Sequence, residues 1–220
     1  ALASLGMPLA PGHINDSNRY TLHGLLARLG AEIIDMGVVP DQPAALEAAL
    51  LEASEMADAI ITTGGVSVGE ADFVKEILAK LGEVTFWKLN IKPGRPMAFG
   101  KVGNAWLFGL PGNPVAVMVS YTQFARDVLL RLAGLDPLPL RPLLTVQSAN
   151  VIRKQPGRRE YLRGALAAVD GVWQVKTTGN QGSGVLRSMS EANCFVVLPE
   201  ACAGVQAGEA VQVELFEGLF

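Results

Sequence analysis

Helix-like and strand-like stretches alternate from about residue 16 to residue 133, and this alternation restricts the fold more than any other feature of the sequence. Asp16 or Ser17 can cap a helix that runs to about Leu29, because short polar side chains accept hydrogen bonds from the first N–H groups of a helix. Apolar spacing predicts further helices at 43–56, 73–81 and 115–132, and strands at 31–39, 58–63, 84–91 and 105–108. This pattern favours an α/β fold in which helices wrap a parallel or mixed sheet.

A proline-rich stretch ends this pattern. Residues 134–142 include three prolines, which remove N–H donors and hold the backbone extended. Beyond them come short β-like runs at 143–148, 160–169, 172–177, 194–198 and 210–215, separated by turn signals such as Asp170-Gly171. We therefore predict an α/β domain over 1–135, a linker over 136–142 and a small all-β domain, barrel or sandwich, over 143–220.

Composition narrows the class of partner. The chain has 18 Lys and Arg against 21 Asp and Glu, a formal net charge of -3, so no basic footprint indicates nucleic acid or an anionic membrane. No apolar stretch reaches the length of a membrane span, and no basic segment opens a signal peptide. Cys194 and Cys202 are too few for a disulfide framework. We expect a reduced, cytoplasmic protein that handles small molecules.

A glycine-rich segment at 62–72 follows a predicted strand and precedes a predicted helix. Glycines let backbone N–H groups approach an oxyanion, and the helix adds its positive end, so the segment has the parts of a phosphate cradle. It matches neither the Walker A loop nor the dinucleotide-binding spacing, and a tight strand-to-helix turn remains an alternative. The candidate binding residues are Thr63, Gly64, Gly65, Ser67 and Gly69.

Two acids stand in successive strand-to-helix loops. Asp72 begins the helix after the glycine loop, and Asp41 follows the preceding predicted strand. Because such loops open at the same edge of a parallel sheet, the two carboxylates can hold Mg²⁺ against substrate phosphates. Helix capping is the alternative explanation for Asp72.

Basic residues follow on the predicted strand at 84–91. Strand alternation places Phe86, Lys88 and Lys92 on one face, with the two lysines roughly 13 Å apart. Proline and glycine flank Arg95 and predict a rigid loop. A solvated strand edge with protective lysines is an equal alternative.

Two further loops carry weaker signals. In the Pro-Gly-Asn-Pro segment at 111–114, Gly112 allows close approach of a ligand and Asn113 can bind polar groups, although a capped helix entry explains both. In the β-rich part, Arg158, Arg159 and Arg163 surround a short predicted strand. Ser183 lies in a polar glycine-rich loop at 179–184. Surface arginines and a hairpin loop are the alternatives there.

Three blocks, taken together, closely resemble the signature segments of the MoeA/gephyrin E-domain family. They are TTGGVSVGEAD at 62–72, FWKLNIKPGRP at 86–96 and GLPGNP at 109–114. The similarity continues at 16–19, 156–158 and 178–183 and covers nearly the whole chain. The resemblance implies a molybdopterin-binding α/β domain followed by a C-terminal β-barrel.

The family's reaction, by this resemblance, inserts molybdenum from molybdate into molybdopterin-AMP and releases AMP with the help of a divalent metal, usually Mg²⁺. Asp41 and Asp72 fall on its catalytic and metal-site acids, and Lys88 and Lys92 on its basic active-site residues. Arg163 and Ser183 fall on the barrel residues that face the oxyanion site. Tetrahedral molybdate suits such donors, because Lys, Arg and Ser hold oxyanions by charge-assisted hydrogen bonds.

The chain departs from the family pattern at its start. The family's N-terminal domains, which contribute to its homodimer and its active site, are absent, so we expect a fragment that alone has little activity. A related molybdopterin adenylyltransferase is the closest alternative and a possible partner, although it typically lacks the barrel. A non-catalytic molybdopterin-binding scaffold is the second alternative.

Overall fold

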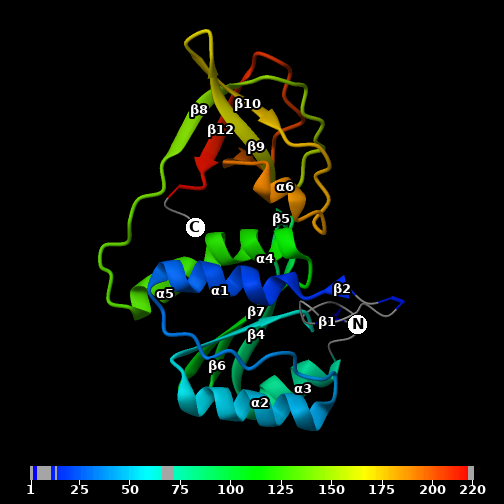
Figure 1. Ribbon diagram of the computed structural model, residues 1–220, viewed down its shortest axis with the longest axis vertical. Coiled ribbons are helices and arrows are strands. Elements are labelled where there is room, and N and C mark those ends of the chain that lie inside the picture. Colours follow the sequence, from blue (N-terminus) through cyan, green and yellow to red (C-terminus); the bar gives the residue numbers. More distant parts are fainter. Residues whose placement is uncertain (1, 4–10, 13, 66–71, 218–220) are drawn as a thin grey trace.

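The computed structural model describes residues 2–3, 11–12, 14–65 and 72–217, and Figure 1 shows a helix-covered sheet with a second, β-rich part stacked on it. The helical segments are α1 (Ser17–Leu29), α2 (Pro43–Met56), α3 (Asp72–Leu81), α4 (Pro114–Ser120), the π-helical η1 (Tyr121–Ala125), α5 (Arg126–Leu132) and α6 (Arg187–Ser190). A short parallel pair, β1 (Leu2–Ala3) and β2 (Ile14–Asn15), precedes α1.

The first sheet has the order β3-β7-β6-β4, built from β3 (Ala59–Thr63), β7 (Ala105–Leu110), β6 (Pro96–Val102) and β4 (Gly82–Lys88). The β3–β7 pair is parallel and the other two pairs are antiparallel, so the sheet is mixed. The α/β fold predicted from the sequence is thus confirmed.

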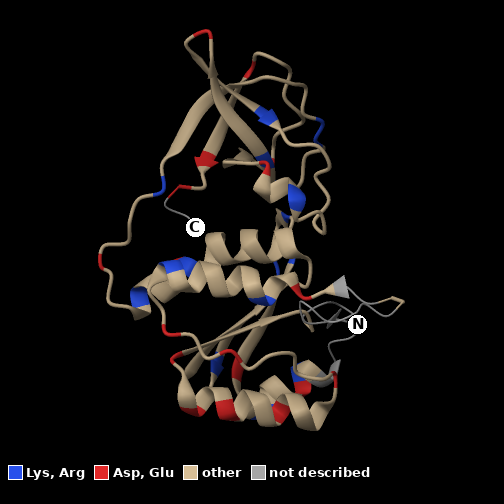
Figure 2. Cartoon of the chain, viewed as in Figure 1, with Lys and Arg blue, Asp and Glu red and all other residues tan. Residues whose placement is uncertain are grey.

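Helices cover both faces of this sheet, with α1, α4 and α5 on one side and α2 and α3 on the other (Figure 1). Strand β7 serves both cores, because Phe108 packs with α1 and α4 while its neighbour Leu107 packs with α2 and α3. Acidic residues lie along α2, whereas α1 carries Lys or Arg (Figure 2).

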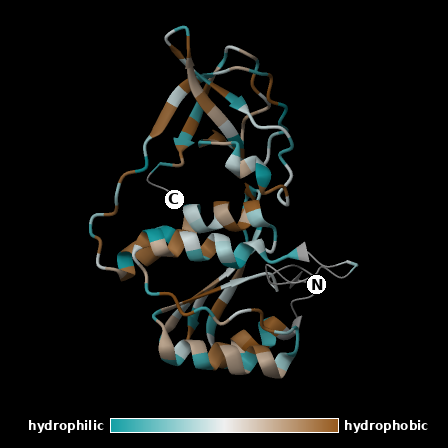
Figure 3. Ribbon diagram, viewed as in Figure 1, coloured by the Kyte–Doolittle hydropathy of each residue, from teal (hydrophilic) through white to brown (hydrophobic). Residues whose placement is uncertain are grey.

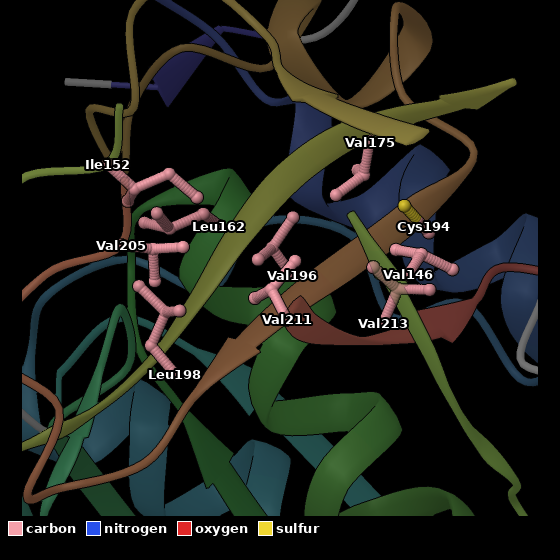
Figure 4. Close-up of a cluster of buried hydrophobic side chains, with 10 residues drawn as sticks. All are labelled: Val146, Ile152, Leu162, Val175, Cys194, Val196, Leu198, Val205, Val211 and Val213. Atoms are coloured by element: carbon pink, nitrogen blue, oxygen red, sulfur yellow. The ribbon is translucent and has the colours of Figure 1, made fainter. Parts of the chain in front are cut away.

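The second sheet closes into a five-stranded barrel. Its strands are β8 (Leu143–Ser148), β9 (Arg159–Val169), β10 (Val172–Thr177), β11 (Cys194–Leu198) and β12 (Ala210–Leu215), in the order β10-β8-β12-β11-β9 with β9 returning to β10. Strands β8 and β9 carry both apolar and polar residues (Figure 3). The inward-facing set includes Val146, Leu162, Val175, Val196 and Val213 (Figure 4). The predicted barrel is confirmed.

A short strand from the α/β part joins the barrel. Strand β5 (Ile91–Lys92) pairs in parallel with β9 and thereby extends the barrel sheet. A shared apolar cluster reinforces this link, with Ile91 and Val119 from one part packed near Phe195 and Val197 from the other.

Two predicted strands differ in the structure. Residues 31–40 form no strand. The N–H of Gly37 is taken by the Asp35 carboxylate, and Gly37 has a φ of 74°, so the backbone turns where a ladder would need it extended. Ile34 and Val38 are about half exposed, at 49% and 48%.

The strand predicted at 84–91 ends at Lys88, and the chain then leaves for the barrel sheet. The predicted polar face is also wrong. Val84 and Phe86 pack against the core under α3, whereas Trp87 is 54% exposed. The Leu89 N–H donates to the Arg95 carbonyl and closes a loop between β4 and β6. Strand β5 lies within this loop and pairs with the second sheet.

Candidate functional site

Four helices, α1 to α4, begin on the same side of the molecule, where β3 and β7 also end (Figure 1). Helix N-termini present free N–H groups and a positive dipole end, so this edge of the sheet favours anions. The loops after β3 and β7 meet here. The Gly64 N–H donates to the Leu110 carbonyl at 3.1 Å, and a Cβ added to Gly112 would lie 3.7 Å from Gly64 Cα.

The described part of the glycine loop has backbone angles that favour glycine. Gly64 and Gly65 have φ angles of 82° and 69°, a region that glycine occupies without strain. Thr63 closes β3 opposite Leu110. Ser67 and Gly69 lie outside the described residues.

Asn18 is a polar residue of this edge that the sequence analysis did not single out as a site residue. It is buried, at 6% exposure, and its Nδ2 donates to the Gly112 carbonyl at 2.7 Å. Its Oδ1 is buried with no hydrogen-bond partner in the described part of the chain. The sequence signal for Asn18 was an amide side chain two residues after the N-cap residue Asp16. Ordinary helix capping explains a polar residue at this position equally well.

The barrel contacts this edge through Asn113 and Ser183. Asn113 Nδ2 donates to Ser183 Oγ at 3.0 Å, and the Val115 N–H donates to the Ser183 carbonyl at 3.0 Å. Asn113 is the N-cap residue of α4, yet its side chain makes no capping hydrogen bond. Two predicted binding residues, one from the loop before α4 and one from a barrel loop, are therefore brought together, and side-chain capping does not explain Asn113.

Arg163 lies behind the loop that carries Ser183. It is fully buried, so it is no surface arginine. Its Nε donates to Ser188 Oγ at 3.0 Å, and Nη2 donates to the Gly182 and Asn180 carbonyls at 3.1 and 3.4 Å. Nη1 is buried without a partner among the described residues. Burial lowers the pKa of Arg163 to about 10, which leaves the guanidinium charged at neutral pH.

The two predicted lysines lie on different strands. Lys88 is exposed at the end of β4, while Lys92 lies in β5, where its Nζ is 3.3 Å from a carboxylate oxygen of Glu160. Gly94 packs against α4 so closely that an added Cβ would lie 2.7 Å from Ser120 Oγ. The loop is thus held on both sides, but the predicted 13 Å spacing along one strand does not apply.

The predicted metal-site acids are only partly described. Asp41 is exposed in the bend before α2, and Asp72 is the first residue of α3, with a side chain outside the described part. No cluster of three or more His, Cys, Asp or Glu suited to a metal occurs among the described residues. This does not conflict with Mg²⁺, which is often held by one or two carboxylates together with substrate phosphates.

Two surface hollows lie apart from these residues. One, of about 470 Å³, is lined by Thr21, Met118, Leu186, Arg187, Met189, Ser190 and Phe216. The other, of about 390 Å³, lies beside Trp173 and is lined in part by Val146 of the barrel core and by Leu166 and Leu215, which pack against that core. None of the predicted site residues lines either hollow.

No helix among the described residues is long and apolar enough to cross a membrane.

Comparisons with known proteins match two successive regions of the chain. Residues 1–131 match a probable molybdopterin binding domain, and residues 145–216 match the MoeA C-terminal region, domain IV. The molybdopterin molybdenumtransferase of Haemophilus influenzae is 42% identical over 99% of this chain and 54% of its own length. Gephyrin of Dictyostelium discoideum is 32% identical over 93% of this chain and 33% of its own.

Solved structures show the same architecture. The molybdopterin biosynthesis MoeA protein of Pyrococcus horikosii superposes with a TM-score of 0.80 at 29% identity, over 98% of this chain and 51% of that protein. The chain spans about half the length of the curated molybdenumtransferases that it matches. The two family models match successive regions that together cover most of the chain, and the solved MoeA structure shares its overall fold. The chain therefore belongs to the MoeA family.

Proposed function

We propose that the chain takes part in molybdenum cofactor biosynthesis by binding molybdopterin-AMP and inserting molybdenum from molybdate, with release of AMP. The Asn113–Ser183 hydrogen bond carries this proposal. It joins the glycine-lined edge of the α/β part to a polar loop of the barrel, so one substrate can contact both. Cytoplasmic location and a homodimer belong to the same proposal, as do domain limits at 1–135 and 143–220 with a linker between them.

The binding and basic residues divide into three groups in this proposal. Gly65 and Gly112, with Ser67 and Gly69 from the sequence pattern, would bind the phosphates and pterin through backbone N–H groups. Thr63 and Gly64 would shape the start of this loop, where the Gly64 N–H is bonded to the Leu110 carbonyl. Ser183 and the unpartnered Nη1 of Arg163 would hold molybdate, with Asn113 completing the contact. Lys88 and Lys92 would add positive charge beside the anionic groups as they react.

Asp41 and Asp72 would hold Mg²⁺ against the substrate phosphates, where the ion offsets negative charge when the phosphoanhydride breaks. Support comes from the placement of their helices, because α2 and α3 begin on the same side as the end of β3 (Figure 1). Hard oxygen donors of this type suit Mg²⁺.

Two other functions stay as alternatives. A molybdopterin adenylyltransferase would use the same glycine loop, but it gives no role to the barrel or to Ser183. Such an enzyme is a possible partner that supplies the adenylylated substrate. A scaffold that binds molybdopterin without turnover would keep the edge of the sheet intact and lack the reaction.

A chimera tests this proposal. Residues 1–220 would replace the matching half of the Haemophilus influenzae molybdenumtransferase, and AMP release from molybdopterin-AMP would be measured with molybdate and Mg²⁺. We expect turnover, and we expect Ser183→Ala to raise the half-saturating molybdate concentration about tenfold, which corresponds to the loss of one hydrogen bond to a charged group. Ser190→Ala is the control, because among the described residues that hydroxyl donates to the Arg187 carbonyl within α6.

The outcomes separate the alternatives. A chimera that binds molybdopterin-AMP but releases no AMP would identify a scaffold. One that forms molybdopterin-AMP from ATP instead would identify an adenylyltransferase. If Ser183→Ala and Ser190→Ala behaved alike, Ser183 would have no role in molybdate binding.

A further inference from the structure

Strand β5, which carries Lys92, pairs with the barrel strand β9. In the parallel pairing of β5 with β9, Ile91 lies beside Arg159 and Lys92 beside Glu160. The Arg159 N–H donates to the Asn90 carbonyl at 3.0 Å, and Asn90 Nδ2 donates to the Gly157 carbonyl at 2.8 Å. The position of Lys92 is therefore set by the barrel rather than by the sheet from which its chain segment comes.

Glu160 faces Lys92 across this pairing. The Lys92 Nζ lies 3.4 and 3.3 Å from the two Glu160 carboxylate oxygens. The Glu160 side chain is only 9% exposed, whereas the Lys92 side chain is 50% exposed. A buried carboxylate is unfavourable unless it is paired, so Glu160 holds the ammonium group, while the exposed side of Lys92 stays free to meet a ligand.

We propose that Glu160 is a positioning residue, which holds the Lys92 ammonium at the edge of the site so that it meets the anionic substrate in one orientation. The proposal rests on the proposed function, in which Lys92 contacts that substrate. It assigns to Glu160 no contact with the substrate itself.

Two opposing effects decide the expected result. The negative charge of Glu160 would repel an anionic substrate. If Glu160 acted only through this repulsion, Glu160→Gln would strengthen substrate binding. Losing the partner of Lys92 would instead let a long, flexible side chain sample many rotamers. Because the Lys92 ammonium lies 3.3 Å from the Glu160 carboxylate and offsets its charge, we expect the loss of orientation to dominate.

The first test needs no substrate. Native protein would be acetylated briefly with an amine-reactive ester, and each lysine would be quantified by mass spectrometry in the parent, Glu160→Gln and Glu200→Gln proteins. We expect Glu160→Gln to speed acetylation of Lys92 about two- to fivefold, the range for loss of a partly exposed ion pair, with Lys88 unchanged. Glu200→Gln is the matched control, because it breaks the neighbouring exposed Arg159–Glu200 pair at 3.4 Å. Equal Lys92 rates in all three proteins would overturn the proposal.

The second test uses the chimera in a double-mutant cycle. Glu160→Gln should lower turnover about fivefold or more. It should have no further effect once Lys92→Ala is present, because a positioning residue acts only through its partner. Additive losses, or tighter anion binding in Glu160→Gln, would overturn the proposal. Thermal unfolding of each variant would identify a folding defect, and in that case the acetylation result decides. An inactive parent chimera with the acetylation difference intact would contradict the proposed function and leave Glu160 as the residue that holds Lys92.

Discussion

At the scale of single residues, Arg163 shows how the barrel stabilises a buried charge. Removing a guanidinium from water is costly, and no ion pair to Arg163 occurs among the described residues. Carbonyl groups of the 180–182 segment and Ser188 Oγ offset part of this cost. The remaining Nη1 is a donor that an oxyanion would satisfy, so its burial has a functional explanation in the proposed molybdate site.

Cys194 leads to a prediction about thiol chemistry. It is fully buried in the barrel core, which raises the pKa of its thiol to about 12, whereas Cys202 is only partly buried. Because the thiolate is the reactive form, a disulfide reagent at pH 8 should modify Cys202 alone in the native protein and both cysteines in denaturant. Counting released chromophore and mapping the modified peptide checks this, with Cys202→Ser as the control. Rapid native modification of Cys194 would contradict the barrel packing.

The raised pKa of the Cys194 thiol also predicts how the free energy of unfolding changes with pH. The unfolded thiol ionises near pH 9.0 and the folded one near 12, so its contribution to stability is present below pH 9 and is lost as the pH rises towards 12. Burial likewise raises the pKa of Tyr121 to about 12. Urea unfolding at pH 8 and pH 11 should therefore give a lower free energy of unfolding at the higher pH.

At the scale of elements, β9 is the strand on which the barrel depends. Its first half pairs with β11 and β5 and its second half with β10, and the change of partner occurs at Gly164. A Cβ there would lie 2.6 Å from Val175 Cγ2 and 2.9 Å from Val196 Cγ2, both in the barrel core. Glycine is required here by close packing.

Gly164→Ala should accordingly lower the free energy of unfolding by about 1–3 kcal/mol, the usual cost of overfilling a packed core. Gly179→Ala is the matched control, because an added Cβ there meets nothing within 4 Å. Its expected effect is within about 0.5 kcal/mol. Urea titration of both variants measures the difference, and equal stabilities would mean that β9 can shift to accommodate the methyl group.

Local patterns predicted most of these elements. Strands β8, β10, β11 and β12 match the predicted limits, because alternating apolar residues and turn signals determine them locally. Three helices beginning at Ser17, Pro43 and Asp72 also follow from caps and spacing. The fourth predicted helix, 115–132, is interrupted by the π-helical η1, which spacing alone does not reveal.

Features that depend on distant partners could not be predicted in this way. The pairing of β5 with β9 joins residues 68 positions apart, and no local signal encodes it. The same holds for the Asn113–Ser183 contact, although both residues were predicted as binding residues. Glu160 was missed because an acid at the start of a strand resembles a solvent-facing residue until its burial is known.

At the scale of the whole molecule, the two sheets are joined at several places. A cluster of seven buried residues spans them, with Val115 and Val119 on α4 facing Phe195 and Val197 on β11. Such burial contributes on the order of 10 kcal/mol, comparable with the total stability of a domain. Arg141 adds a polar link, donating to the Thr122 carbonyl at 2.7 Å and pairing with Glu214 at 3.6 Å.

These links predict that the chain unfolds as one unit, although its sequence suggests two domains. Helices longer than α6 all lie in the α/β part, so circular dichroism at 222 nm reports that part. Modification of Cys194 reports opening of the barrel, because the thiol is fully buried there. In Cys202→Ser protein, both signals should give the same urea midpoint, since opening the barrel would expose Val115 and Val119 and destabilise α4.

The Gly164→Ala variant gives a second test of cooperative unfolding, because the added methyl group meets only barrel side chains among its nearest neighbours. Under cooperative unfolding it should lower the midpoint of both signals equally, including the helix signal from elements that it does not touch. Separate midpoints, with Cys194 modified before the helix signal falls, would instead mean that the barrel opens independently. The Asn113–Ser183 contact would then form and break within the folded protein, and the proposed site would be assembled by closure rather than preformed.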